Sequence, residues 1–511
     1  MHKRRMVICF AAALLSLLAM ACPAHARAQE GILRALFVAC ENFLSQPSMS
    51  PSSSNNVAIV SRAFSAGASM PDSLFIEDGT IATLDALRSA VHAAFDGATE
   101  SDVSLFYLST HGVYDASLPD TPPVLLLSDG QTETAMTAMD LRAILDDIPG
   151  TKLIILDACN SGAFIGKGMD VNVFSDGTHA FASPEYKVLT SCGGNEQSWY
   201  WNLHSQGVQQ YGSSYFALTL ANALRQSSVC PADANRDDAV SLSELYDYLL
   251  RTQPTSTAQV FPQNDSDFIV FTPDPDAAEI EPLLQNISFE NTVLTMDAPE
   301  LAFSFTVTRP VRVLYQLVYT RQGVWDWPNA QLIYDDTLSG AAATLEPGRV
   351  ERTISLGGID AESSGYALLQ LIAVSETGLE VCEGRVLCVQ PMVGDPQLRI
   401  TAGASFSPIE GRELPIEVSS DFPVSLTVGV YDASGALVRR LAVQRSMRPS
   451  GSQEESAQFY WDGLDRNGES VSEGFYTLRA ETTIGGVRYV TSLENIYVSS
   501  QALPVQLTPI G

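Results

Sequence analysis

Between about residues 30 and 272, short apolar segments alternate with amphipathic ones, and this alternation restricts the possible folds more than any other feature. The apolar segments are rich in branched residues and have no polar face, which is typical of strands buried on both sides. The segments between them place apolar residues at intervals of three and four, which predicts helices. The predicted strands are 34–40, 102–110, 152–158, 186–192 and 267–272, and the predicted helices are 83–95, 138–148 and 213–226. The predicted fold class is therefore α/β, a mostly parallel sheet with helices on both faces.

The pattern changes at a proline-rich, acidic linker, residues 273–282, which closes an α/β domain at 29–272. After the linker, short alternating segments are separated by Gly, Pro and Asp turns, and no convincing amphipathic helix is seen. We predict two all-β sandwich domains at 283–394 and 395–500, followed by a tail at 501–511.

The N-terminus has the pattern of an export signal. A basic head at Lys3, Arg4 and Arg5 precedes an apolar stretch, and small residues follow up to Ala28. We predict a cleaved signal peptide at 1–28 and a protein that is secreted, periplasmic or at the cell surface. A lipid anchor at Cys22 is the alternative. No later segment has the ~18 apolar residues that a helix needs to cross a bilayer, so we expect no integral membrane span.

The charge of the chain restricts its partners. The net charge is −30, and the leader holds four of the 29 basic residues and no acidic one, so export leaves a charge near −34. Such a surface repels phosphate backbones, so we expect no nucleic-acid partner. It would attract cations and basic peptides, although acidity that only keeps an exported protein in solution is the simpler interpretation.

Two predicted strands end in residues that can carry chemistry. His111 and Gly112 follow the strand in "SLFYLSTHGVYD", and Cys159 follows the strand in "LIILDACNSG", 48 residues after His111. If these strands are neighbours, both side chains emerge at the same edge of the sheet. A cysteine nucleophile needs an imidazole beside its thiol, and the backbone N–H groups of Gly112 and Cys159 would be donors for an oxyanion.

Each of these signals is weak when it is taken alone. A single cysteine at a strand end is more often a small core residue, and a single loop histidine is usually only solvated. Four histidines remain after export, and only His111 directly follows a buried strand. The pair is therefore far more specific than either residue.

The motifs "STHG" and "DACNSG", each behind an apolar strand, resemble those of the caspase-like cysteine peptidases, the group of metacaspases, clostripains and legumains. The resemblance covers residues 30–272 and implies a caspase-like α/β/α sandwich that hydrolyses peptide bonds. It implies that His111 is the general base and Cys159 the nucleophile, with the backbone of Gly112 and Cys159 as the oxyanion site.

The same resemblance suggests a substrate pocket. Asp157 stands where animal caspases have glutamine, and a carboxylate there would favour arginine or lysine before the scissile bond. The alternative is that Asp157 only caps a neighbouring turn. Ser191 and Cys192 are candidates for the wall of this pocket, and Trp199 and Tyr200 for a hydrophobic neighbouring site. If basic residues are preferred, Lys167, in a polar loop after the nucleophile strand, becomes a candidate self-cleavage site.

Residues 233–244, "DANRDDAVSLSE", fit a twelve-residue calcium loop. The predicted ligands are Asp233, Asn235, Asp237, Ala239 through its carbonyl, Ser241 through water, and Glu244. Asp238 stands at the sixth position, where glycine is usual, and no second loop of this kind accompanies it. A solvated acidic turn is the alternative interpretation. Calcium is the only cofactor that we expect, and we expect no organic one.

Residues 395–500 resemble the Ig-like domain of flagellar hook-capping proteins. The resemblance rests on Trp461-Asp462-Gly463, on the turn at Asn467-Gly468, and on Gly474 before Tyr476. Trp461 would anchor the core and the Asn-Gly pair would join two hairpin strands. Such modules are spacers, stabilisers or attachment surfaces.

The leading hypothesis is an exported cysteine endopeptidase that acts on proteins or peptides and cleaves after arginine or lysine. A legumain-like preference for asparagine, or transpeptidation, is an alternative within the same class. The alternative from another class is a catalytically silent scaffold that binds a surface through its β domains.

Overall fold

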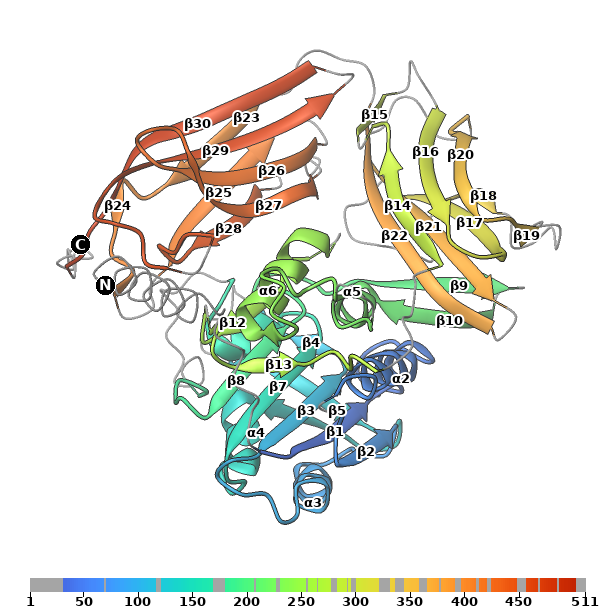
Figure 1. Ribbon diagram of the computed structural model, residues 1–511, viewed down its shortest axis with the longest axis vertical. Coiled ribbons are helices and arrows are strands. Elements are labelled where there is room, and N and C mark those ends of the chain that lie inside the picture. The colour runs from blue at the N-terminus through green and yellow to red at the C-terminus, as the bar shows by residue number, and fades with distance from the viewer. Residues whose placement is uncertain are drawn as a thin grey trace, which may run out of the picture.

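The computed structural model describes most of the chain from residue 31 to residue 501 (Figure 1). The predicted signal peptide, residues 277–282 of the predicted linker and residues 502–511 of the tail lie outside the described residues. The described ranges are 31–68, 70–115, 121–168, 180–205, 208–226, 230–253, 256–263, 265–276, 283–291, 293–295, 300–320, 331–335, 344–357, 365–375, 378–390, 397–409, 413–420, 424–447, 456–466, 469–484 and 487–501.

A mostly parallel sheet organises the N-terminal part of the chain, which confirms this part of the predicted fold class. Its strands lie in the order β12-β8-β7-β3-β1-β2, and only β12 runs antiparallel to its neighbour. The strands are β1 (Leu33–Ala39), β2 (Ser73–Asp78), β3 (Val103–Ser109), β7 (Thr151–Asp157), β8 (Tyr186–Thr190) and β12 (Gln259–Phe261).

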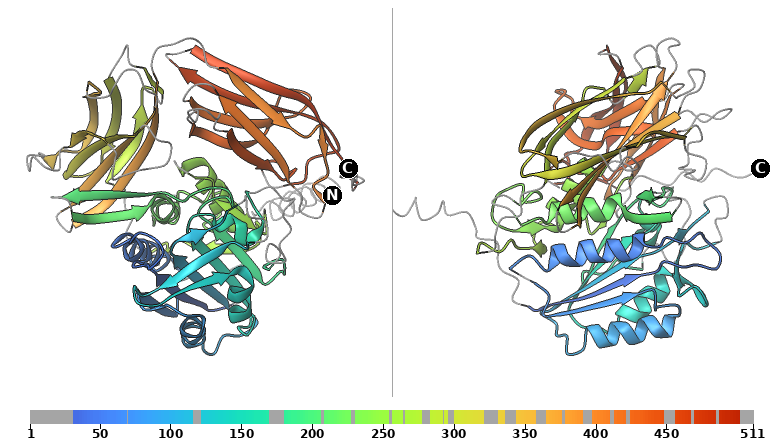
Figure 2. Two further views of the ribbon diagram at one scale, coloured as in Figure 1. Left: turned by 180° about the vertical axis from the view of Figure 1, so that it is seen from behind. Right: turned by 90° about the vertical axis from the view of Figure 1, so that its right-hand side faces the viewer.

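Helices cover both faces of this sheet, and the views of Figures 1 and 2 agree on the layering. Because side chains alternate along a strand, Phe37 and Tyr107 join one core while Leu36 and Phe106 join the other. The first core includes residues of α2 (Ser52–Phe64), α5 (Tyr215–Ala223) and α6 (Leu242–Thr252). The second includes residues of α3 (Leu84–Ala94) and α4 (Ala138–Leu145).

Side-chain caps set where several of these helices begin. Thr83, Thr137, Ser214 and Ser241 each accept a hydrogen bond from a backbone N–H in the first turn of the helix that follows. Such caps satisfy N–H groups that have no partner within the helix. At Thr137 and Ser241 an acidic residue three positions later completes a capping box.

One predicted strand was placed wrongly. Residues 267–272 form only β13 (Ile269–Phe271), which pairs with β11 (Val240–Ser241) and lies outside the central sheet. Phe268, Val270 and Phe271 are still buried in the first core. The apolar run therefore predicted burial correctly, but a short apolar run does not indicate which strand the segment pairs with.

The connection between β3 and β7 is also more complex than a single helix. Besides α4 it contains a small antiparallel sheet of β4 (Gly112–Val113), β5 (Val124–Ser128) and β6 (Glu133–Thr137). A hairpin of β9 (Tyr200–Ser205) and β10 (Val208–Ser214) precedes α5. Among the described helices, none combines the length and apolar character needed to cross a membrane.

The remaining chain is built of paired β-sheets, as the alternating sequence pattern predicts. The middle β region has one sheet of β14 (Leu284–Phe289), β16 (Glu300–Val307) and β20 (Gly348–Ser355). Its second sheet contains β15 (Val293–Thr295), β17 (Val311–Thr320), β18 (Gln331–Asp335), β19 (Thr344–Leu345), β21 (Gly365–Ser375) and β22 (Gly378–Gln390).

The C-terminal β region, residues 397–501, repeats this plan with its own core. Its sheets contain β23 (Leu398–Ala402), β25 (Leu414–Ser420) and β28 (Ser456–Trp461), and β24 (Ser405–Phe406), β26 (Val424–Tyr431), β27 (Leu437–Met447), β29 (Gly474–Ile484) and β30 (Val487–Val498). Trp461 is fully buried, and its ring lies 5.3 Å from those of Phe406 and Tyr476. The predicted turn at Asn467-Gly468 lies outside the described residues.

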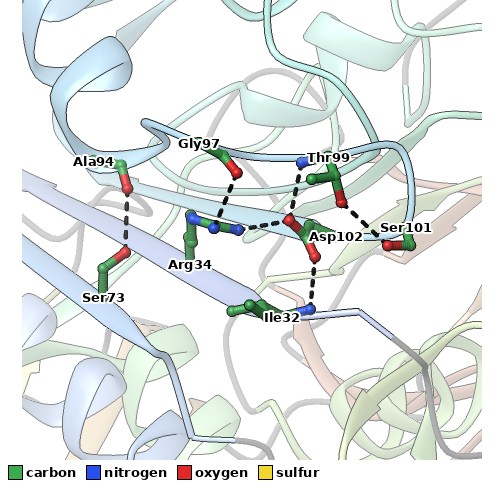
Figure 3. A network of polar contacts seen from close by, with 8 residues as sticks. All are labelled: Ile32, Arg34, Ser73, Ala94, Gly97, Thr99, Ser101 and Asp102. Atoms are coloured by element: carbon green, nitrogen blue, oxygen red, sulfur yellow. Dashed lines mark hydrogen bonds and ion pairs between the residues drawn. The ribbon is translucent and has the colours of Figure 1, made fainter.

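A carboxylate at the start of β3 ties together the ends of the strands that lie farthest from His111 and Cys159 (Figure 3). Asp102 accepts hydrogen bonds from the backbone N–H groups of Ile32 and Thr99, at 2.8 and 2.9 Å. It also pairs with Arg34 at 2.7 Å, and both side chains are nearly buried. These bonds, above all that from Ile32, lower the pKa of Asp102 to about 2.

We predict that Asp102→Asn lowers the free energy of unfolding by about 3 kcal/mol at neutral pH, because Arg34 loses its buried partner. The folded-state pKa is lower than the ordinary value of 3.8. The advantage of the native protein is therefore complete above that value and shrinks as the pH falls toward 2. Denaturant unfolding of both proteins across this range measures the difference, and a difference independent of pH would contradict the assignment.

Candidate active site

The register of β3 and β7 brings the two predicted catalytic residues to one edge of the sheet. The strands are parallel neighbours, and Ser109 pairs with Asp157 at their carboxyl ends. The N–H of Thr110 donates to the carbonyl of Asp157 at 3.2 Å, which extends the pairing by one step. His111 and Cys159 each come two residues after that last pair, so they leave the sheet at the same level.

The backbone at Gly112 lies directly against the turn at Cys159. A Cβ atom on Gly112 would stand 1.7 Å from the carbonyl oxygen of Cys159, so only glycine fits there. Asn160, the residue after Cys159, has a φ of 57°, in the left-handed region that asparagine tolerates better than most residues. Its side chain donates to the carbonyl of Gly194 at 2.8 Å. The Cys159 turn is therefore held from both sides.

The thiol of Cys159 is half-buried and donates a hydrogen bond to the carbonyl of Ser198, with a distance of 3.5 Å. Burial raises its pKa to about 11, and the nearby charge of Asp157 adds to the effect. The hydrogen bond to Ser198 opposes the shift without cancelling it. In this arrangement the resting thiol is protonated at neutral pH.

The imidazole of His111 is also held by a backbone carbonyl. Its Nε2 lies 2.9 Å from the oxygen of Pro47, and because a carbonyl only accepts, Nε2 carries the proton. Nδ1 is then the basic nitrogen of the neutral ring. Phe43 packs edge-on against the imidazole, with ring centroids 4.6 Å apart. Burial lowers the pKa of His111, and the bond to Pro47 and the charge of Glu133 limit the shift.

Among the described contacts, no hydrogen bond joins His111 to Cys159. The imidazole bonds to the carbonyl of Pro47 instead, and the thiol to that of Ser198. Both groups are neutral in this state, which differs from a preformed thiolate–imidazolium pair.

Asp157 lies behind Cys159, on the face of the sheet covered by α5. It is 3% exposed and accepts hydrogen bonds from Tyr107 at 2.9 Å, Ser198 at 3.4 Å and Ser214 at 2.5 Å. Ser214 also caps α5, so the carboxylate lies near the positive end of that helix. Burial raises the pKa of Asp157 to about 6, and these hydrogen bonds oppose the rise.

The other predicted pocket residues differ in their exposure. Ser191 and Cys192 are fully buried, and their side chains bond to the backbone of Ala158. They support the Cys159 turn from beneath, and their part in a pocket stays a prediction. Trp199 and Tyr200 are half-buried in the segment that leads into β9, which is compatible with the predicted neighbouring site.

Lys167, the predicted self-cleavage site, lies in a loop as expected, and the loop is held by contacts to other parts of the chain. Its ammonium pairs with Glu413 of the C-terminal β region at 2.7 Å, and the two side chains are 12% and 5% exposed. The backbone N–H of Lys167 donates to Gly162 and its carbonyl accepts from Gly194, each at 2.9 Å. Side chain and backbone of Lys167 are therefore both held in this structure, and self-cleavage at this residue stays a prediction.

The predicted calcium loop is held by its own hydrogen bonds. The carboxylate of Asp233 accepts from the N–H groups of Arg236, Asp237 and Asp238, and Asp238 has a φ of 64°, as the turn at this position requires. The carboxylate of Glu244 caps α6 and accepts from Ala234 and Asn235. Within the described residues, no three His, Cys, Asp or Glu side chains form a group suited to a metal. Calcium binding at this loop stays a prediction.

Comparison with known families agrees with the class that this geometry suggests. Residues 1–179, which include His111 and Cys159, match the family model of the CHAT domain, a domain of the caspase-like cysteine-protease type. Residues 406–486 match the family model of the FlgD Ig-like domain, in agreement with the resemblance noted from Trp461 and its turns. Comparison with curated proteins gives no match.

Three solved structures show weak similarity. Protein GSU0716 from Geobacter sulfurreducens is 15% identical over 49% of this chain and 98% of its own, with a TM-score of 0.30. The YadV chaperone is 12% identical over 42% of this chain and 100% of its own, with a TM-score of 0.26. Dimeric latent PorU from Porphyromonas gingivalis is 14% identical over 48% of this chain and 22% of its own, with a TM-score of 0.18. At these scores the similarities carry no argument about function.

Several residues of the site were not predicted from the sequence. Ser198 and Pro47 act through their carbonyls, which no side-chain pattern reveals. Tyr107 and Ser214 hold Asp157 from distant points in the chain. Asn160 was the easiest of these to predict, because an asparagine between a strand end and Ser-Gly is a common turn signal.

We predict that Gly112→Ala displaces the Cys159 turn, because the new methyl group would overlap a backbone oxygen. The expected loss of unfolding free energy is about 1–3 kcal/mol, with a clear change in the rate at which iodoacetamide alkylates Cys159. Gly403→Ala is the matched control, since a Cβ there meets its nearest atom at 3.5 Å. Equal behaviour of the two variants would contradict the close approach.

For the acidic loop, the sequence predicts that millimolar calcium raises the melting temperature and that Asp237→Asn removes the increase. A ligand present at about 100 times its dissociation constant adds about 2.7 kcal/mol of stability. Thermal unfolding with calcium, with magnesium and with chelator makes the comparison. An unchanged melting temperature in the native protein would identify the loop as a solvated acidic turn.

Proposed function

We propose that this chain is a cysteine endopeptidase in which Cys159 is the nucleophile and His111 the general base. The single observation that supports it most is the β3–β7 register, which leads both residues off the same edge of the sheet. The contact between Gly112 and the carbonyl of Cys159 adds to this, because it brings the two loops together. The match to a caspase-like domain type agrees with the proposal.

The proposed reaction has two steps. When a peptide binds, Nδ1 of His111 takes the proton of the thiol, and the sulfur attacks the carbonyl carbon of the scissile bond. The backbone N–H groups of Gly112 and Cys159 are the proposed donors to the oxyanion. The leaving amine then takes the proton from His111, and a thioester remains on Cys159. Water activated by His111 hydrolyses the thioester and restores the thiol.

The neutral resting pair fits a mechanism in which the base acts only once a substrate is bound. The thiol pKa of about 11 leaves little thiolate in the free protein. Because the pKa of His111 is lowered, its imidazole is neutral at neutral pH and can accept a proton. A substrate that displaces the thiol from Ser198 would then start the reaction.

Asp157 is the proposed determinant of specificity. Its pKa of about 6 leaves it ionised at pH 7, and a buried carboxylate favours an arginine or lysine side chain over a neutral or acidic one. The carboxylate is 3% exposed and accepts hydrogen bonds from Tyr107, Ser198 and Ser214, so a substrate cation would reach it only by displacing some of these donors. An asparagine preference, as in legumains, is the outcome that would exclude this role.

Export of the peptidase is also part of the proposal, on the strength of the basic head and apolar stretch of residues 1–28. A second function is a silent scaffold that binds surfaces through its β regions. The raised thiol pKa and the separate hydrogen bonds of His111 and Cys159 favour that alternative. Kinetic assays distinguish the two.

We predict that the protein cleaves fluorogenic peptides after arginine or lysine, and not after aspartate. Cys159→Ala should abolish cleavage, and Asp157→Asn should lower kcat/KM for arginyl peptides by about tenfold or more, since a charged pair in such a pocket contributes about 1.5–3 kcal/mol. Cys40→Ala is the matched control, because Cys40 is a buried cysteine that follows β1, another strand of the same sheet.

Cleavage that survives in Cys159→Ala would contradict the nucleophile assignment. A preference for aspartyl peptides would contradict the role of Asp157 alone. If no peptide in the panel is cleaved by the native protein, the scaffold function replaces the peptidase.

A further inference from the structure

A buried ion pair joins the segment after the nucleophile to the C-terminal β region. Lys167 and Glu413, 246 residues apart, approach to 2.7 Å, and both side chains are nearly buried. The ammonium also donates to Gln263 at 3.2 Å, within the α/β part of the chain. Breaking one side of such a pair leaves an uncompensated buried charge, so the contact resists separation.

Lys167 is connected to the Cys159 turn through consecutive backbone hydrogen bonds. Its N–H donates to the carbonyl of Gly162, on the short helix η1 (Ser161–Ile165) that directly follows the nucleophile turn. Its carbonyl accepts from Gly194, whose own carbonyl accepts from the side chain of Asn160. A shift of Lys167 therefore moves the residues that flank Cys159.

A second contact reaches the same loop. The side chain of Asn195 donates to Gln458 of β28 at 3.4 Å. Asn195 lies three residues before Ser198, whose carbonyl accepts the hydrogen bond of the Cys159 thiol. The C-terminal β region thus touches both segments that fix the position of the thiol.

The interface around Glu413 is charged and incompletely hydrogen-bonded. Arg439 and Asp462, both more than nine-tenths buried, lie close by in the same β region, and Tyr246 of α6 lies against Arg439. Within the described residues, one oxygen of Glu413, one oxygen of Asp462 and Nη2 of Arg439 are buried without a hydrogen-bond partner. An apolar spacer would not need buried charges at this point, and the cluster gives the contact a specific geometry.

We propose that Glu413 is a positioning residue for Cys159, and that the C-terminal β region is the part of this chain that holds the nucleophile turn in place. The region would therefore help to form the site, and would not serve only as a spacer or attachment surface. The effect on catalysis rests on the proposed peptidase function, whereas the effect on the thiol does not.

The test uses the full-length protein and measures the rate at which iodoacetamide alkylates Cys159, with peptide mapping to identify the labelled residue. In Glu413→Gln and Lys167→Met, we expect the rate to rise roughly tenfold, because the turn loosens and the thiol becomes exposed. The double variant should react like either single variant, since one pair is lost in each case. For peptide cleavage, kcat should fall more than KM changes.

Asp102→Asn is the matched control, because the Arg34–Asp102 pair is buried to the same extent, with side chains 11% and 5% exposed, and lies at the opposite end of the sheet. It should lower the melting temperature and leave the alkylation rate unchanged. If Glu413→Gln does not fold, Gln458→Ala, at an exposed contact, should raise the rate in the same direction.

Alkylation rates within about twofold of the native value in these variants would overturn the proposal, as would an equal increase in Asp102→Asn. If the rates respond while the native protein cleaves no peptide, the peptidase function fails and the positioning role stands. If cleavage is normal and the rates do not respond, the positioning role fails and the peptidase function stands.

Discussion

The parallel pairing of β3 with β7 is the constraint on which the rest of the site depends. It sets Ser109 opposite Asp157, and two residues later on each strand come His111 and Cys159. A shift of the register by one residue would point these side chains to opposite faces. The buried apolar residues on both faces of the two strands prevent such a shift, because they must enter two separate cores.

Most of the layered fold could be predicted because buried strands and helices have characteristic patterns of apolar residues. The strands around His111 and Cys159, and the helices between them, follow from apolar periodicity alone. The same signal failed for residues 267–272, which are buried but pair with β11. It also overlooked α2, whose first turn is rich in serine and asparagine. Ser52, Ser53 and Asn56 are buried, and Asn56 bonds to Ser109 and Ser214, so these inward positions are polar and apolar periodicity does not reveal the helix.

The site was predicted by residue type but not by electrostatic state. The sequence singled out a cysteine, a histidine and an aspartate, whereas their protonation depends on burial and on contacts from distant segments. Burial raises the pKa of the thiol and of Asp157 and lowers that of His111. Lys167 shows the same limit most clearly, because its partner Glu413 lies in another part of the chain, and no local sequence pattern predicts this ion pair.

Covalent capture tests directly whether the β3–β7 register makes His111 and Cys159 one reactive pair. The native protein and His111→Ala would each be treated with an arginyl peptide that carries an electrophilic ketone, and the adduct located by peptide mapping. We expect labelling at Cys159 in the native protein, with or without calcium, and little labelling in His111→Ala. A label on another residue, or labelling of Cys159 that does not depend on His111, would contradict it.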